Sequence, residues 1–330
     1  MRKDVAKAAG VSESAVTRTL NGGYVSPSVR ERVMLAIETL NYKPNALARA
    51  LRTGRTQQIA CISPAIDNPF FSEVIRGIEE IAIDHGYILS IYSSQVIDRR
   101  HETFLLPGRY DGVILLSPSE LNSWLVQELA ESHIPLATFW DWGSESPYPS
   151  VAVDLVTGVE EVIAHLFSQG HQRIGYLGYL PSAETDVNPR LLGFRRAFVN
   201  ADVDRAPYCV ELVAGFGTME EGYAGASRLF RNYAGLTAVF ASNDMLAFGA
   251  MKWLRENGYD VPRQVSVVGC DDTPFCTMSN PSLSTIQIPK RDVGQQLMQL
   301  VLKGQRNTDL TVHVTLPSRL IVRESSGPAL

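Results

Sequence analysis

The sequence predicts an α/β protein with an all-helical N-terminal headpiece and a hinge helix, followed by a two-lobed core of doubly wound parallel sheets. Three observations lead to this fold class. Residues 1–58 contain short helical patterns, and after them short β-rich runs alternate with helical segments. Such alternation indicates parallel sheets covered by helices. About ten β-rich runs are more than one such sheet needs, so this chain of 330 residues is expected to form two lobes.

The charge of the chain is divided unevenly along its length. Residues 1–58 hold ten basic and four acidic side chains, a net charge of +6, whereas the whole chain carries −5 and the remainder therefore −11. A basic segment on an acidic protein is expected when only that segment meets a polyanion. The headpiece is therefore the candidate for nucleic-acid binding.

Residues 2–20 have the pattern of a helix-turn-helix. Residues 2–9 form one helical segment, Gly10 interrupts it, and Ser12 is suited to cap a second helix that runs to about Leu20. The side chains on one side of the second helix are mostly small, so this helix must pack tightly on the first. The side chains on its other side are polar. The inner side comprises Ala15, Val16, Thr19 and Leu20, and the outer side comprises Glu13, Ser14, Thr17, Arg18 and Asn21.

A third helix and a hinge complete the headpiece. Ser26 is placed to cap the third helix and Pro27 fits its first position, ahead of an apolar stripe that runs from Val29 to Leu40. The segment NALARALRTGR, residues 45–55, can form a further short helix rich in arginine. A helix of this length has no reason to be stable alone.

The composition is that of a folded protein, with 45% hydrophobic and 20% charged residues. The N-terminus has no apolar signal region and no apolar run approaches the ~20 residues of a membrane span, so a cytoplasmic location is expected. The four cysteines have no metal-ligand spacing, and we expect reduced thiols, no metal and no cofactor. They are Cys61, Cys209, Cys270 and Cys276.

Motifs along nearly the whole chain resemble the LacI/GalR (lactose/galactose repressor) family of transcriptional regulators. They run from RKDVAKAAGVSESAVTRTLN through DNPFFSEVIRGIEE, GHQRIGYLG, SNDMLAFGAM and VSVVGCDDTPF to LPSRLIVRES, in the family's order and spacing. The resemblance implies a periplasmic-binding-protein-like core that binds a small-molecule effector, expected to be a sugar or a sugar derivative. It also implies a homodimer on a near-palindromic DNA operator. Because no heptad repeat follows the core, we do not expect a coiled-coil tetramer.

The resemblance and the patterns together divide the chain into three parts. Residues 1–44 form the headpiece, residues 45–57 the hinge helix and linker, and residues 58–330 the core. The chain is expected to cross between the lobes near Asp154, Ser284 and Pro317. The N-terminal lobe would then comprise about 58–154 and 285–316, and the C-terminal lobe about 155–284 and 317–330.

The family's pattern places DNA contacts on the second helix and on the hinge. Arg18 can donate twice to a guanine edge. Glu13 either accepts from cytosine or simply stabilises the helix N-terminus. Leu51 matches a leucine that intercalates at the centre of the operator, and a core contact is a weaker reading because its neighbours are Arg and Ala. The full set is Glu13, Ser14, Thr17, Arg18, Asn21, Arg49, Leu51 and Arg52.

Ligands of doubly wound folds bind beyond the carboxyl ends of the strands, here in the cleft between the lobes. The resemblance implies that Arg190 and Asp271 hold the effector there, and that Phe70 lines the cleft. Asn243 has a competing structural role as a helix N-cap. The expected effector residues are Phe70, Arg190, Phe216, Asn243 and Asp271.

Two other classes of protein share this core architecture. A cleft enzyme needs a nucleophile and a base, and no histidine of the chain has the context of a known catalytic motif, so we do not expect an enzyme. A sugar-binding transport protein needs a secretion signal and has no headpiece. Residues 1–57 are the feature that separates these alternatives from a DNA-binding regulator.

Overall fold

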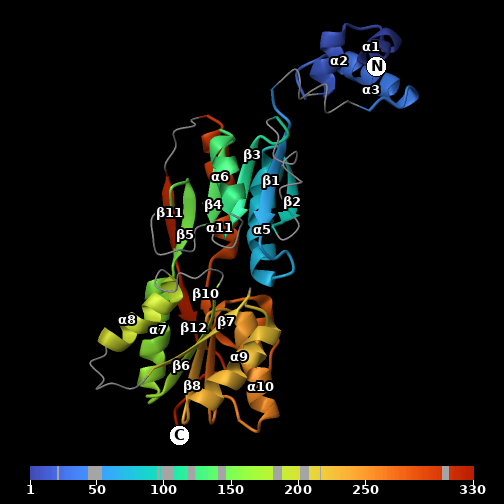
Figure 1. Cartoon of the computed structure of the whole chain (residues 1–330). Coiled ribbons are helices and arrows are strands. Elements are labelled where there is room, and N and C mark those ends of the chain that lie inside the picture. The colour runs from blue at the N-terminus through green and yellow to red at the C-terminus, as the bar shows by residue number, and fades with distance from the viewer. Residues whose placement is uncertain are drawn as a thin grey trace. The chain divides into compact units, whose positions relative to one another are not determined.

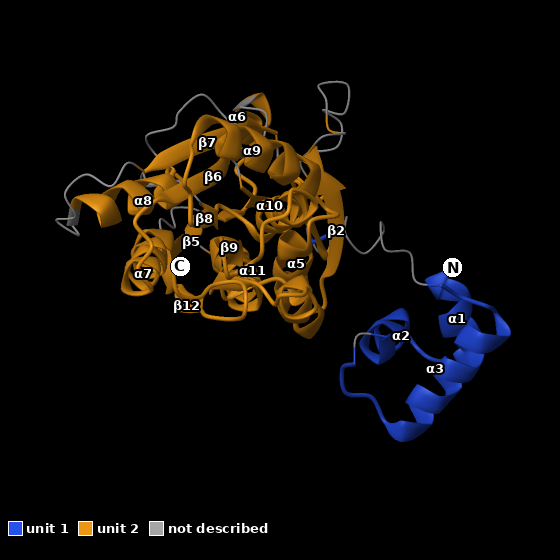
Figure 2. Ribbon diagram, turned by 90° about the horizontal axis from the view of Figure 1, so that it is seen from below, with its two compact units in different colours: residues 1–56 blue, residues 57–330 orange. Residues whose placement is uncertain are grey.

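The chain forms two compact units, residues 1–56 and residues 57–330, in the computed structural model (Figure 2). The structure describes residues 1–20, 22–43, 54–94, 97, 108–117, 123–139, 146–180, 188–200, 208–215, 217–306 and 312–330. Five of the predicted contact residues lie outside these ranges: Asn21, Arg49, Leu51, Arg52 and Phe216.

The headpiece has the three predicted helices, α1 (Arg2–Ala9), α2 (Glu13–Leu20) and α3 (Pro27–Thr39). Gly10 ends α1 in the left-handed conformation, at φ 61°, which costs glycine little. Pro27 occupies the first turn of α3, where its missing N–H is not needed. The buried core of this unit consists of small and β-branched side chains: Val5, Ala6, Ala9, Val16, Val33 and Ala36.

The N-terminal lobe of the core is a parallel six-stranded sheet in the order β11-β5-β4-β3-β1-β2 (Figure 1). Alternate residues of β1 point to opposite faces, so Ile59 packs with helices α5 and α11 whereas Ala60 packs with α6. The elements are β1 (Gln58–Ser63), α5 (Pro69–Asp84), β2 (Ile88–Ser93), β3 (Gly112–Leu116), α6 (Ser123–Glu131), β4 (Leu136–Phe139), β5 (Ser150–Asp154), α11 (Lys290–Gly304) and β11 (His313–Pro317).

The C-terminal lobe is a second six-stranded sheet in the order β12-β10-β9-β8-β6-β7, parallel except for β12. Helices α7 and α8 cover one face, and α9 and α10 cover the other (Figure 1). The elements are α7 (Leu155–Ser168), β6 (Ile174–Leu180), α8 (Pro189–Asn200), β7 (Cys209–Ala214), α9 (Met219–Asn232), β8 (Ala238–Ala241), α10 (Asp244–Glu256), β9 (Ser266–Asp271), the 3-10 helix η5 (Pro274–Thr277), β10 (Ser284–Gln287) and β12 (Arg319–Ile321).

The chain crosses between the lobes after Asp154, between Gln287 and Lys290, and after Pro317. The crossing lies a few residues after the position that we expected near Ser284. Strand β10 begins at Ser284 and pairs with β9 and β12 as far as Gln287, so residues 285–287 belong to the C-terminal lobe and not to the N-terminal lobe. The chain crosses after this strand.

Candidate functional site

The outer face of α2 is polar and accessible. Ala15, Val16 and Thr19 are buried against the rest of the headpiece, while Glu13, Ser14 and Arg18 are exposed. Thr17 is half-buried, and its hydroxyl donates a 2.9 Å hydrogen bond to the backbone oxygen of Glu13. The described side chains predicted to contact DNA therefore share one face of one short helix. A helix with such a face can enter the major groove.

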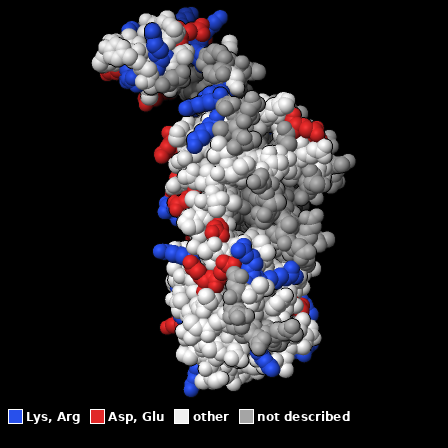
Figure 3. Space-filling view, turned by 90° about the vertical axis from the view of Figure 1, so that its left-hand side faces the viewer, with Lys and Arg blue, Asp and Glu red and all other residues white. Residues whose placement is uncertain are grey.

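The headpiece also exposes basic side chains and one aromatic residue. Lys3, Lys7, Arg30 and Arg32 are exposed in the same unit, and Lys and Arg side chains are visible on the face of the headpiece in Figure 3. Tyr24 follows α2 and is 89% exposed. We missed Tyr24 in the sequence, where its place after two glycines reads as a simple turn. The backbone N–H of Gly23 donates to the backbone oxygen of Arg18 at 2.8 Å, so the exposed ring of Tyr24 follows a residue in contact with α2 and is a candidate contact.

Residues from both lobes enclose a small cavity at the carboxyl ends of the strands. Its volume is about 20 Å³, which is room for about one water. A ligand of sugar size therefore needs the lobes to part. Four of the five predicted effector residues line this cavity. The complete lining is Ala65, Asn68, Phe70, Phe71, Ser117, Phe139, Tyr179, Arg190, Asn243 and Asp271.

Arg190 brings a buried positive charge to the cavity. It lies in the first turn of α8, where its backbone N–H donates to Oδ1 of Asn188 at 3.0 Å. Its side chain is buried, and its Nε has no hydrogen-bond partner among the described residues. Burial alone lowers the pKa of Arg190, but the neighbouring acidic groups, Cys270 foremost, raise it overall. The guanidinium therefore stays charged and keeps a donor for a ligand.

Asp271 is the last residue of β9 and its side chain is buried. Burial raises the pKa of its carboxyl well above the ordinary range, and the nearby Asp244 raises it further. The positive charges of Arg190 and Lys290 act in the opposite direction. A carboxyl in this environment can hydrogen-bond the hydroxyl groups of a ligand.

Asn243 is a helix N-cap, which is the structural role that the sequence left open. Its Oδ1 caps α10 by accepting from the backbone N–H of Leu246 at 2.8 Å. Its Nδ2 donates to the backbone oxygen of Gly217 at 3.0 Å. The side chain still lines the cavity, but only one of its amide hydrogens remains for a ligand.

Aromatic side chains of the N-terminal lobe form the wall opposite Arg190 and Asp271. The ring of Phe70 lies 5.1 Å from that of Phe71 and 5.7 Å from that of Phe139. Phe139, Tyr179 and Ser117 were not among our predicted residues. Each lies at or just after the carboxyl end of a parallel strand, and that position was the available signal.

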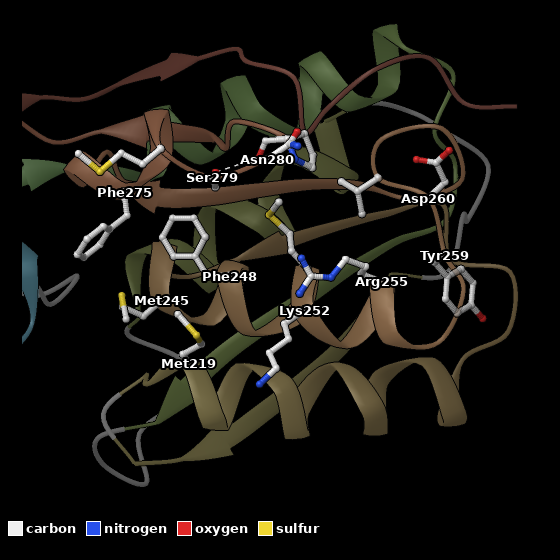
Figure 4. A pocket seen from close by; sticks show the side chains of 14 residues that line it. Met219, Met245, Phe248, Lys252, Arg255, Tyr259, Asp260, Phe275, Ser279 and Asn280 are labelled. Atoms are coloured by element: carbon white, nitrogen blue, oxygen red, sulfur yellow. Dashed lines mark hydrogen bonds between the residues drawn. The ribbon is translucent and has the colours of Figure 1, made fainter.

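A much larger hollow lies away from the cleft, on the surface of the C-terminal lobe (Figure 4). Its volume is about 710 Å³, and it lies between α10 and the segment 275–281. Phe248 of α10 faces Phe275 across it, and four methionines contribute to its lining. Two of its apolar side chains, Phe275 and Met278, are exposed. We assign it no effector, because its lining comes from the C-terminal lobe alone, whereas the effector cleft lies between the two lobes.

Among the described residues, no cluster of His, Cys, Asp or Glu has the arrangement of a metal site. The described helices include none with the length and hydropathy to cross a lipid bilayer.

Comparison with family models locates two regions of the chain. The model of bacterial regulatory proteins of the lacI family matches residues 3–45, and that of the periplasmic binding protein-like domain matches residues 163–326. Among curated proteins, catabolite control protein A of Priestia megaterium is 31% identical, with 98% of each chain covered. The HTH-type transcriptional regulator DegA of Bacillus subtilis is 33% identical, over 98% of this chain and 97% of that protein.

Two solved structures are similar over most of their length. The lac repressor dimer bound to operator and the anti-inducer ONPF has a TM-score of 0.84 and 26% identity, and 98% of each chain is covered. A LacI family regulator from Enterococcus faecium with bound ribose has a TM-score of 0.72 and 27% identity, over 83% of this chain and 100% of that one.

Proposed function

Because the chain belongs to the LacI family of bacterial regulatory proteins, a family of DNA-binding transcriptional regulators, we propose that it represses genes by binding a near-palindromic operator as a homodimer. A small molecule bound in the cleft of the core controls this binding. The proposal rests on the observation that one chain contains two separate candidate sites. The polar outer face of α2 lies in one compact unit, and the cavity with Arg190 and Asp271 lies in the other.

The headpiece reads the operator through the outer face of α2. Arg18 contacts a guanine edge, and Ser14, Thr17, Asn21 and Glu13 contact neighbouring base edges or position the helix. Tyr24 adds a contact beside this face. In the hinge, Arg49 and Arg52 contact phosphates, and Leu51 is the wedge that bends the central step of the operator.

The effector is a small polyhydroxylated ligand, a sugar or a derivative of one. Arg190 and Asp271 hydrogen-bond its hydroxyl groups, and Phe70 stacks against its apolar face. Asn243 contributes its remaining amide hydrogen, and Phe216 contributes from the neighbouring loop. The ribose bound in the Enterococcus faecium relative supports this class of ligand. The cleft binds the ligand without chemistry, and the protein acts in the cytoplasm on the nucleoid.

Effector control requires the ligand to bind two arrangements of the lobes with different affinity, because a ligand with equal affinity for both shifts nothing. The closed cavity of about 20 Å³ is one such arrangement, and the parted lobes that admit a ligand are the other. The change in the lobes then moves the paired hinges of the dimer.

We also propose where the two copies meet. Two groups of exposed apolar side chains lie on the core, Phe275 and Met278 beside the large hollow, and Ile83, Ile88 and Ile91 on α5 and the edge strand β2. The elements α5, β2 and α10 lie on the side of the core away from α7 and α8 (Figure 1). Burying apolar surface against a second copy stabilises a dimer.

The test of the effector site starts with a thermal-shift screen of sugars, sugar phosphates and purines, because a ligand raises stability by RT ln(1 + [L]/Kd). Isothermal titration of the compound found is then repeated with Arg190→Ala and Asp271→Ala. Each should weaken binding by about 1.5–3 kcal/mol and abolish the effector response, while operator binding without effector stays nearly intact. Arg196→Ala is the control, because Arg196 is an exposed residue of the same helix. Unchanged affinity in Arg190→Ala or Asp271→Ala removes that residue from the site.

A further inference from the structure

Lys290 is the first residue of α11 and is anchored to the N-terminal lobe. Helix α11 crosses α5 so closely that a Cβ at Gly77 would lie 2.1 Å from the backbone oxygen of Arg291. A Cβ at Gly294 would lie 2.0 Å from the backbone oxygen of Val74. Such a contact excludes any larger side chain, so the two helices form one packed pair. Lys290 therefore moves with the N-terminal lobe.

The ammonium group of Lys290 reaches the other lobe. Its Nζ donates hydrogen bonds to the backbone oxygen of Asp271 at 2.5 Å and to that of Asp272 at 2.7 Å. On its own side, Nζ lies 3.5 Å from Oε2 of Glu73, a residue of α5. The side chain of Lys290 is only 4% exposed. A buried ammonium is costly unless it is paired and hydrogen-bonded, and here both lobes supply the partners.

The backbone that Lys290 holds has an unusual conformation. Asp271 has φ 130° and Asp272 has φ 56°, in a region that residues other than glycine rarely adopt. Strained conformations persist only when the surroundings hold them. Within the C-terminal lobe, Arg323 and Gln287 hold the Asp272 side chain at 2.6 Å and 2.8 Å. From the N-terminal lobe, Lys290 holds the backbone of Asp271 and Asp272 through its two hydrogen bonds.

We propose that Lys290 is a positioning residue that latches the two lobes, holding the cleft closed and the backbone of Asp271 in place. The contact lies beside a crossing of the chain, where the two lobes meet. When the lobes part to admit a ligand, the ammonium of Lys290 remains near Glu73 in the N-terminal lobe and loses its hydrogen bonds to the backbone of Asp271 and Asp272. The latch itself does not depend on the effector or operator proposed above, although its regulatory meaning does.

Single-molecule energy transfer between the lobes tests the latch without any effector or DNA. Dyes are attached to Glu128→Cys on α6 and Ala224→Cys on α9, two exposed positions in different lobes. The four native cysteines are buried, so labelling selects the introduced ones. Mixing the labelled full-length chain with excess unlabelled chain keeps both dyes within one subunit of a dimer.

Lys290→Met keeps the apolar stem and removes the charge, and we expect it to move molecules from the wild-type transfer efficiency to a different, more open population. Lys290→Arg restores a cation and should return most molecules to the wild-type efficiency, which a general loss of packing at this position does not explain. Lys303→Met, at the exposed far end of α11, is the matched control and should leave the distribution unchanged.

A second variant keeps the test decisive if Lys290→Met does not fold. Lys290→Gln removes the charge but keeps a polar side chain with one hydrogen-bond donor at the buried position, and a smaller shift in the same direction is expected. A wild-type distribution in a folded Lys290→Met, or in Lys290→Gln where Lys290→Met does not fold, overturns the latch. The proposed regulator function is untouched by that result, because no ligand or operator enters the measurement.

Discussion

The hydroxyl of Thr285 donates a 2.6 Å hydrogen bond to Oδ1 of Asp244, which ties β10 to the first turn of α10. Asp244 is fully buried, and burial raises the pKa of its carboxyl. Its other oxygen accepts from the backbone N–H of Thr273 at 2.7 Å and from the thiol of Cys276 at 3.1 Å. The carboxyl next to the predicted effector residue Asn243 is therefore a structural support.

Thr285→Val should destabilise the core. The substitution keeps the shape of the side chain but leaves one oxygen of a buried carboxyl without its donor, which costs about 1–3 kcal/mol. Denaturant unfolding followed by circular dichroism measures the loss. Thr277→Val is the control, because the hydroxyl of Thr277 bonds only a backbone oxygen at an exposed site. Equal stability of the two variants contradicts the assigned role.

The headpiece was predictable from local pattern, whereas parts of the core were not. Gly10 and Pro27 mark helix ends through their own conformational preferences, which act whatever the tertiary structure. The lobe that residues 285–287 join depends on pairing with β9, a contact distant in sequence, and the local pattern does not contain it. The role of Asn243 was left open for a similar reason. The sequence offers a cap, but only the fold brings Gly217 to its amide.

Arg18→Ala should weaken binding to the selected operator more than binding to random DNA. Loss of a bidentate contact to guanine costs about 1–3 kcal/mol of discrimination, whereas non-specific binding depends mainly on phosphate contacts. The operator is first selected from a pool of random duplexes, and affinities are then measured at fixed salt. Lys7→Ala removes an exposed charge of α1 and should lower both affinities alike. Parallel losses for Arg18→Ala exclude base reading by this residue.

Asp271→Asn should stabilise the effector-free protein increasingly as pH rises. The pKa of Asp271 is raised in the folded state, so its contribution to stability is complete below the unfolded pKa and is lost as pH rises through the folded pKa. Asparagine does not titrate. The melting temperature of Asp271→Asn minus that of the wild type should therefore grow as pH rises above the unfolded pKa of an aspartate, about 3.9.

Glu324→Gln provides the control of opposite sign for this pH dependence. Hydrogen bonds from Ser282 lower the pKa of Glu324, so its contribution is present above the unfolded pKa and is lost as pH falls. The deficit of Glu324→Gln relative to the wild type should shrink toward low pH. A melting-temperature difference for Asp271→Asn that does not change with pH shows that its carboxyl titrates alike in the folded and unfolded states.

Met278→Glu should convert the dimer to a monomer. Met278 is 75% exposed beside the large hollow on the C-terminal lobe, and a carboxylate there has to be desolvated when a second copy covers the surface. Val199→Glu is the matched control, since Val199 is 79% exposed but lies on α8, away from the proposed interface. Sedimentation at micromolar concentration should give a monomer for the first variant and a dimer for the second.

The same variant should also bind the operator more weakly. Because one headpiece of a monomer engages only one half-site, we expect Met278→Glu to lose at least about tenfold in operator affinity, as linked binding sites are separated. A dimeric Met278→Glu with unchanged affinity places the interface elsewhere, and the same substitution at Ile88 of the edge strand β2 is then the next position to measure.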